Sequence, residues 1–297
     1  MNFKVTICVS IILLIFGNAN GSFFGGSDKE DNKKMNNNTE NLYDKTSFNT
    51  KLILLHDSNT VTIRGPIGPM STTKFISDIH KKDTDDVYVF LTTPGGSVIH
   101  GYQIIQVIDA LNKMGKNVYC IADVAYSMGF GILQACPTRF AMTGSSIMQH
   151  QMSFGIKGQL ENNKNRMTFI EEIESQMTER QSKRLGLSVE EFKEKTLSDW
   201  WLFGRSIIEN KGADEMVNVL CDKSLTEKFY TEEYDLLFFG KIYIDFSECP
   251  LISDPLKVYF KDVDTNNTTQ ITDSKKISQI MDDINNNYIK NYQILIH

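Results

Sequence analysis

The chain has 297 residues, with 31 basic against 37 acidic side chains and a formal net charge of −6. Hydrophobic residues make up 41%, and Gly and Pro number 19 and 6, an ordinary globular composition that excludes a collagen, a long low-complexity chain and a coiled-coil rod. The mild acidity, with no run of five basic residues, indicates no nucleic-acid partner. The 5 cysteines are too few for a disulfide-rich scaffold and lack metal-ligand spacing, so we expect no metal and a core without disulfides.

Met1–Gly21 has the pattern of a secretory signal peptide. Lys4 supplies a positive charge, Val5–Phe16 is an apolar run, and Ala19-Asn20-Gly21 offers small residues for cleavage. Because a bilayer span needs roughly 20 apolar residues, we expect no stable membrane insertion. A buried N-terminal strand or helix is the alternative, which the following polar stretch disfavours. Residues 22–50 are Asn-rich and are expected to form a polar linker or transit-like segment.

Beyond residue 50, short β-rich runs alternate with runs of helical spacing, which predicts an α/β fold with a largely parallel sheet. The predicted strands are Lys51–His56, Thr60–Arg64, Asp86–Thr92, Asn117–Ala122, Arg139–Met142 and Met216–Leu220. The predicted helices are Thr72–His80, Tyr102–Met114, Met128–Gln134, Asn163–Arg184, Val189–Leu197 and Arg205–Asn210. We expect one domain over residues 51–222.

Residues 223–297 follow as a C-terminal extension in which we find no chemical motif. The aromatic run Phe229–Phe239 predicts a helix. Lys241–Phe246 and Leu256–Phe260 are β-like, and the chain ends in an Asn-rich stretch. The role of this extension stays open.

Polar residues at the ends of predicted elements are the candidates for chemistry. Ser127 lies at a strand-to-helix turn, where the next backbone N–H points out of a helix N-terminus and can stabilise an oxyanion. Gly95-Gly96, after the preceding strand, offers a second unobstructed N–H. Alone, a serine at this position is more simply explained as a helix cap.

His150 and Asp199 are the candidates for proton transfer. A serine hydroxyl needs a base to become a nucleophile, and an imidazole base needs a carboxylate to fix its tautomer. His150 follows an apolar strand piece, and Asp199 precedes Trp200-Trp201, whose rings we expect to shield a buried carboxylate. Taken singly, the histidine could be an ordinary surface or core residue, and the aspartate could cap a turn.

The order of five motifs resembles the Clp protease proteolytic subunit over roughly Lys51–Leu220. The family has a Pro-Gly-Gly-Ser-Val turn, an Ala-Ser-Met-Gly nucleophile, an Ile-His-Gln histidine and an Asp-x-Phe-Met/Leu aspartate, in this order. The corresponding segments here are Pro94-Gly95-Gly96-Ser97-Val98, Ala125-Tyr126-Ser127-Met128-Gly129, Ile147-Met148-Gln149-His150-Gln151, Gly158-Gln159 and Asp199-Trp200-Trp201-Leu202.

The resemblance implies a serine endopeptidase without a cofactor, with Ser127 as nucleophile, His150 as general base and Asp199 as orienting acid. Gly96 and Met128 would supply the oxyanion N–H groups. The substrate, a peptide or unfolded protein, would add as a strand beside the site. The residues implied in this binding are Val98, Gln151, Met152, Ser153 and Gly155.

The resemblance also implies a crotonase-like fold of stacked ββα units with a protruding handle helix, for which Asn163–Arg184 is the candidate. The apolar stripe of this helix is equally compatible with packing inside the subunit. Family members assemble into seven-membered rings that pair into a double ring, fed by a separate AAA+ unfoldase ATPase. No phosphate-binding loop occurs in this sequence, so nothing indicates that the chain itself hydrolyses ATP.

This sequence departs from the family pattern at several places beside the site. Tyr126 replaces a small residue, which could narrow the site, and Ser198 stands where arginine is common. Met152-Ser153-Phe154 replaces the usual Pro-x-Gly, which affects the substrate strand. Three alternatives therefore stay open: an inactive ring subunit, a signal-peptide-peptidase-like enzyme with a lysine base, and an acyl-CoA enzyme of the crotonase type.

The leader implies entry into the secretory pathway. The final site is then either extracytoplasmic or a plastid-type organelle reached through that pathway. Residues 22–50 carry four basic and five acidic residues, unlike the usual acid-poor transit peptide. We favour the organelle because an ATPase-dependent partner suits its stroma better than the outside of a cell.

Overall fold

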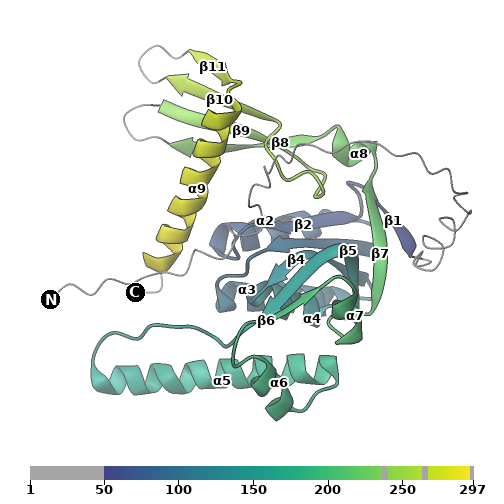
Figure 1. Cartoon of the computed structure of the whole chain (residues 1–297), viewed down its shortest axis with the longest axis vertical. Coiled ribbons are helices and arrows are strands. Elements are labelled where there is room, and N and C mark those ends of the chain that lie inside the picture. The colour runs from purple at the N-terminus through teal and green to yellow at the C-terminus, as the bar shows by residue number, and fades with distance from the viewer. Residues whose placement is uncertain (1–49, 236–239, 263–266, 295–297) are drawn as a thin grey trace, which may run out of the picture. The chain divides into compact units, whose positions relative to one another are not determined.

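A mostly parallel, seven-stranded sheet forms the centre of the computed structural model, which describes residues 50–235, 240–262 and 267–294 (Figure 1). The predicted signal peptide and nearly all of the polar linker lie outside the described residues. The sheet has the order β1-β7-β5-β4-β3-β2, and β6 pairs with β5. Its strands are β1 Lys51–Leu55, β2 Thr60–Arg64, β3 Asp86–Thr93, β4 Asn117–Tyr126, β5 Thr138–Gln149, β6 Trp200–Phe203 and β7 Glu215–Cys221.

Helices separate most of these strands along the chain, as the alternating pattern predicts, while β1 and β2 are joined by a turn. They are α2 Pro69–Ile79, α3 Val98–Lys113, α4 Met128–Ala135, α5 Leu160–Leu185, α6 Val189–Lys195, α7 Arg205–Glu209 and α8 Lys223–Thr226. The predicted α/β fold of the Clp protease type is confirmed. All strand pairs of this sheet are parallel except β5 with β6.

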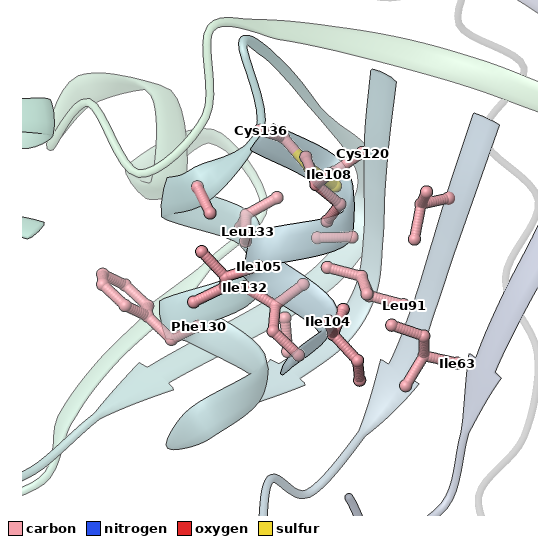
Figure 2. Close-up of a cluster of buried hydrophobic side chains, with 14 of the residues drawn as sticks. Ile63, Leu91, Ile104, Ile105, Ile108, Cys120, Phe130, Ile132, Leu133 and Cys136 are labelled. Atoms are coloured by element: carbon pink, nitrogen blue, oxygen red, sulfur yellow. A yellow bond between two sulfur atoms is a disulfide. The ribbon is translucent and has the colours of Figure 1, made fainter. Parts of the chain in front are cut away.

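The main core lies between one face of the sheet and helices α2, α3 and α4. Ile104 and Ile108 of α3 and Ile132 of α4 are completely buried, and they pack with Leu91 of β3 (Figure 2). Such side chains contribute roughly 1.5–3 kcal/mol each relative to full exposure. The core therefore fixes the two helices that begin at the carboxyl ends of β3 and β4, where the site residues lie.

Two strands run further toward the site than the sequence predicts. β4 extends past Ala122 because the ladder with β5 continues after a register shift between Ala122 and Val124. This bulge interrupts the alternation from which a strand is predicted. β5 continues past its predicted end at Met142 as far as Gln149. Its second half pairs with β6, a strand that the sequence prediction misses.

Helix α5 has one packed half and one exposed half. Met177, Gln181 and Leu185 are buried against the domain, whereas no residue of 160–176 is buried. In Figure 1, no other described helix or strand covers this first half of α5. The predicted helix therefore exists, and its exposed half protrudes as a handle helix does.

The base of α5 is held by ion pairs. Arg180 donates two hydrogen bonds to Asp109 of α3 at 2.7 and 2.9 Å. Arg184 and the buried Arg139 both donate to Asp214. Burial opposes ionisation of Asp214, but the hydrogen bonds and charge of Arg139 outweigh it and hold the pKa of that carboxyl below its usual value.

The C-terminal extension forms a second, antiparallel sheet with the order β11-β10-β9-β8, and one helix packs on it. The elements are β8 Phe229–Asp235, β9 Gly240–Ser247, β10 Lys257–Asp262, β11 Thr268–Ile271 and α9 Ser274–Ile294. The helix predicted over Phe229–Phe239 is wrong. Its first part is β8, which pairs along its whole length with β9, and residues 236–239 lie outside the described residues.

Two disulfides correct the expectation of a core without them. Cys120 of β4 is joined to Cys136, which follows α4, inside the main core (Figure 2). Cys221, at the end of β7, is joined to Cys249 of the extension. Spacing along the sequence did not reveal these pairs because the sheet brings together cysteines 16 and 28 residues apart. Among the described helices, none is long and apolar enough to cross a membrane.

Candidate active site

Ser127 lies between β4 and α4 in a strained backbone conformation. Its φ of 53° and ψ of −116° are rare for a residue with a side chain, and such a conformation costs of order 1–3 kcal/mol. The Ser127 N–H donates to the carbonyl of Met148 at 2.8 Å, and the Ser127 carbonyl accepts from Gly131 at 3.2 Å. The turn is thus fixed from both sides, and Ser127 lies at the predicted strand-to-helix turn.

Gly95 lies directly against this turn. A Cβ atom on Gly95 would lie 2.6 Å from the carbonyl oxygen of Tyr126 and 2.7 Å from the Cβ of Ser127, and its φ is +94°. Only glycine fits both the contact and the conformation. Thr93, which the sequence prediction misses, accepts the Gly95 N–H through its hydroxyl at 3.1 Å, and its methyl group fills the space where a side chain on Gly129 would lie.

The N–H groups of Gly96 and Met128 are available as donors. Gly96 is exposed, and none of the described residues accepts a hydrogen bond from its N–H. Met128 is the first residue of α4, so its N–H has no partner within the helix. A Cβ on Gly95 would lie 3.0 Å from the Met128 nitrogen, which places the two loops in contact.

His150 and Ser127 are brought together, 23 residues apart in sequence. The Nε2 atom of His150 lies 2.8 Å from the Oγ atom of Ser127. His150 directly follows β5, and Ser127 directly follows β4, its parallel neighbour. The meeting of the two side chains is a consequence of parallel pairing, because carboxyl ends of neighbouring parallel strands share one edge of the sheet.

Asp199 lies beside His150 in the strand register but does not bond to it. Gln149 pairs with Trp200 across β5 and β6, so one further step of the antiparallel register sets His150 opposite Asp199. Asp199 is exposed, and among the described residues no hydrogen bond joins it to His150.

The expected shielding of this carboxylate by tryptophan rings is wrong. Trp201 is 54% exposed and lies edge-on to Tyr126, with ring centroids 4.9 Å apart. Trp200 packs against Phe130 of the core instead. Asp199 precedes β6 and is exposed, so its carboxylate stays open to solvent.

Gln151, Ser153 and Gly155, predicted to bind a substrate strand, lie in an exposed segment without regular structure. The backbone of residues 151–155 makes no hydrogen bond to other described residues, so its polar groups are free to pair. Met152 is half-buried and packs on the main core, as does Val98 at the start of α3. Phe154 is 44% exposed.

The Clp protease family model matches residues 44–212, which is more than half of the chain. The chain belongs to the Clp protease family. The match ends close to the predicted domain end at residue 222 and leaves the extension outside it. Membership of this family supports a peptidase, a hydrolase of peptide bonds that acts in proteolysis. Among the described residues, no group of three or more His, Cys, Asp or Glu side chains is arranged to hold a metal ion.

Proposed function

We propose that this Clp-type peptidase is a serine endopeptidase in which Ser127 is the nucleophile and His150 the general base. The observation that carries the proposal is the 2.8 Å contact between Ser127 Oγ and His150 Nε2. This contact is within the range required for proton transfer from a nucleophile to its base. It also favours a histidine base over the lysine base of a signal-peptide-peptidase-like enzyme.

In the proposed reaction, Ser127 Oγ attacks the carbonyl carbon of the scissile bond while its proton passes to His150 Nε2. The N–H groups of Gly96 and Met128 receive the developing oxyanion. The C–N bond then breaks as the imidazolium gives its proton to the leaving amine. A water molecule, deprotonated by His150, attacks the acyl-enzyme and releases the new carboxyl end and free Ser127.

Asp199 is proposed to orient the histidine. For Nε2 to accept a proton, Nδ1 must carry one, and a carboxylate acceptor fixes that tautomer. Residues opposite each other in an antiparallel pair have Cα atoms about 4.5–5.5 Å apart. A change of side-chain rotamer at the exposed Asp199 would therefore bring its carboxylate to Nδ1 of His150.

We further propose that the subunit forms heptameric rings that pair into a closed chamber, with entry controlled by a separate AAA+ unfoldase. The protruding half of α5 supports ring pairing, because Phe169 and Leu160 there are 54% and 69% exposed in the single subunit. Exposed apolar side chains of this size are typical of interfaces. The substrate would pair with the free backbone of residues 151–155.

For the location, the two disulfides and the leader favour a chain that folds in an oxidising compartment. Both an extracytoplasmic site and a plastid-type organelle reached through the secretory pathway stay compatible with this. N-terminal sequencing of the mature protein, with a count of free thiols before and after reduction, tests the proposal. A mature protein that retains Met1 and has only free thiols would contradict it.

The decisive experiment is active-site labelling of the full chain in its native assembly. A fluorophosphonate probe should label Ser127, and Ser127→Ala should lose both labelling and peptide hydrolysis. Ser58→Ala, which changes an exposed turn serine, is the matched control and should keep both. An assembled ring without labelling would indicate the inactive subunit, and binding of coenzyme A without hydrolysis of peptides would indicate the acyl-CoA enzyme.

A further inference from the structure

A chain of buried amides connects helix α5 to the backbone of His150. The His150 N–H donates to the Gln149 side-chain oxygen at 3.1 Å. The Gln149 amide nitrogen donates to the side-chain oxygen of Gln181 on α5. The Gln181 amide nitrogen donates to the Met177 carbonyl, one helical turn earlier, at 3.2 Å. The chain thus runs from the handle helix to the proposed base.

The direction of every hydrogen bond in this chain is set by its two backbone ends. A backbone N–H only donates and a carbonyl only accepts, whereas each glutamine side chain offers both an oxygen and an NH₂ group. With the His150 N–H at one end and the Met177 carbonyl at the other, both glutamines have one possible orientation. A rotation of either amide would set two donors or two acceptors against each other.

Burial makes this arrangement costly to break. Gln149 is 6% exposed and Gln181 is 3% exposed, on the face of the sheet covered by helices. Polar groups buried this deeply are almost always hydrogen-bonded. A packing role alone would be met by an apolar side chain, so the fully paired amides of Gln149 and Gln181 indicate a use other than filling the core.

We propose that Gln149 and Gln181 are positioning residues that hold the backbone of His150 from helix α5 and so set the direction of its imidazole toward Ser127. The inference rests on the proposed function, in which His150 is the base. His150 lies just beyond the last ladder residue of β5, so the sheet alone does not fix its backbone. The Gln149 side chain supplies the missing acceptor for its N–H.

The test uses Gln149→Met, Gln181→Met and the double variant in the full-length assembled protein. Each single variant should lower kcat about tenfold with KM changed less than twofold, because a small displacement of a base slows the chemical step more than binding. The double variant should lose no more than the larger single loss, because the two amides act as one unit. Thr178→Val, which removes a part-buried hydrogen bond made by a buried side chain of α5, should keep kcat.

Hydrogen exchange of the His150 amide provides a readout independent of activity. This amide should exchange at least tenfold faster in Gln149→Met and Gln181→Met than in the wild type or Thr178→Val. Unchanged exchange, or unchanged kcat in both single variants, would overturn the inference even if the wild type is an active serine peptidase. If instead Ser127→Ala retains peptidase activity, the proposed function fails, while the exchange measurement still decides whether the amide chain holds His150.

Discussion

The two sheets of this protein are held in different ways. The central sheet is mostly parallel, is buried on both faces over most strands, and carries Ser127 and His150 at the carboxyl ends of neighbouring strands. The extension is an antiparallel sheet covered by α9, and a few discrete links join it to the central sheet. The links include the disulfide Cys221–Cys249, the ion pair of Lys228 with Asp57, and hydrogen bonds from Arg64 to Tyr230 and to the carbonyls of Cys249, Pro250 and Ile252.

Because of this difference, we expect the peptidase site of the central sheet and the links to the extension to respond separately to mutation. The site geometry follows from paired parallel strands and a packed core, so an added atom near the turn at Ser127 should disturb it. The extension covers part of the second face of the central sheet with Leu225, Cys249 and Ile252, whereas Ser127 and His150 directly follow β4 and β5. Changes at the site should therefore leave the extension intact, and changes at the links should leave the chemistry intact.

The largest expected effect is at His150. His150→Ala should lower kcat/KM by at least about 10⁴-fold, because the serine loses its base. Steady-state hydrolysis of a fluorogenic peptide measures this, and unfolding of the extension should be unchanged. His80→Ala, at the exposed end of α2, is the matched control and should keep full activity. Full activity of His150→Ala would favour a lysine base.

Gly95→Ala should cost less, but still about 10²-fold or more in kcat. The added Cβ would lie within 2.7 Å of both Tyr126 and Ser127 and must displace the nucleophile turn. A displacement of about 1 Å near the reacting groups typically costs 10²-fold. The same change at Gly144, an exposed glycine of β5 with no atom within 4 Å of its would-be Cβ, is the control. Equal activity of both variants would show that the turn is not held by Gly95.

At the disulfide of the extension, we expect a loss of stability without a loss of activity. Cys221→Ser should destabilise the extension by about 3.5 kcal/mol, the effect expected of a disulfide that closes a loop of this length, here with a sequence separation of 28. Peptidase activity should stay within twofold. Urea unfolding and hydrogen exchange over β8 to β11 provide the measurement, and Cys249→Ser should give the same loss. A parallel loss of activity would show that the two sheets are not independent.

Much of the central fold, and the proximity of Ser127 to His150, could be predicted from the sequence. Alternating short strands and helices specify a parallel sheet, and Ser127 and His150 each follow a strand of that sheet. The two side chains lie close together because these strands are parallel neighbours and end at the same edge of the sheet. The confirmed elements are those whose apolar period is uninterrupted, such as α3 and the strands β1 to β3.

Most of the elements and contacts that the sequence did not predict have one physical cause. Pairing between segments far apart in the chain decides their structure against the local sequence pattern. The bulge after Ala122 hides the end of β4, and pairing with β9 turns the aromatic run after Phe229 into a strand. The amphipathic spacing of Ile277, Ile280 and Ile284 could have revealed α9, but the Asn-rich composition obscured it. The disulfides and the amides of Gln149 and Gln181 had no local signal, because each pair forms only through the folded sheet.

The smallest expected effect lies at the base of α5, where the central domain itself relies on discrete polar links. Asp214→Asn removes the carboxylate that accepts from the buried Arg139, and the loss at neutral pH should be about 2 kcal/mol, less than for a fully buried pair because Asp214 is 36% exposed. The pKa of Asp214 is lowered in the folded state from 3.8, so its stabilisation is complete above that pH and is lost as the pH falls through the folded value. The difference in unfolding free energy between wild type and variant should therefore shrink steadily below about pH 4.

Asp83→Asn is the control, because Asp83 is exposed and makes no side-chain hydrogen bond or ion pair with other described residues. Urea unfolding from pH 3 to 7 gives the free energies for both variants. A pH-independent loss for Asp214→Asn would mean that the carboxylate acts by shape and hydrogen bonding rather than by charge. In that case the base of α5 would resemble the packed core more than the links of the extension.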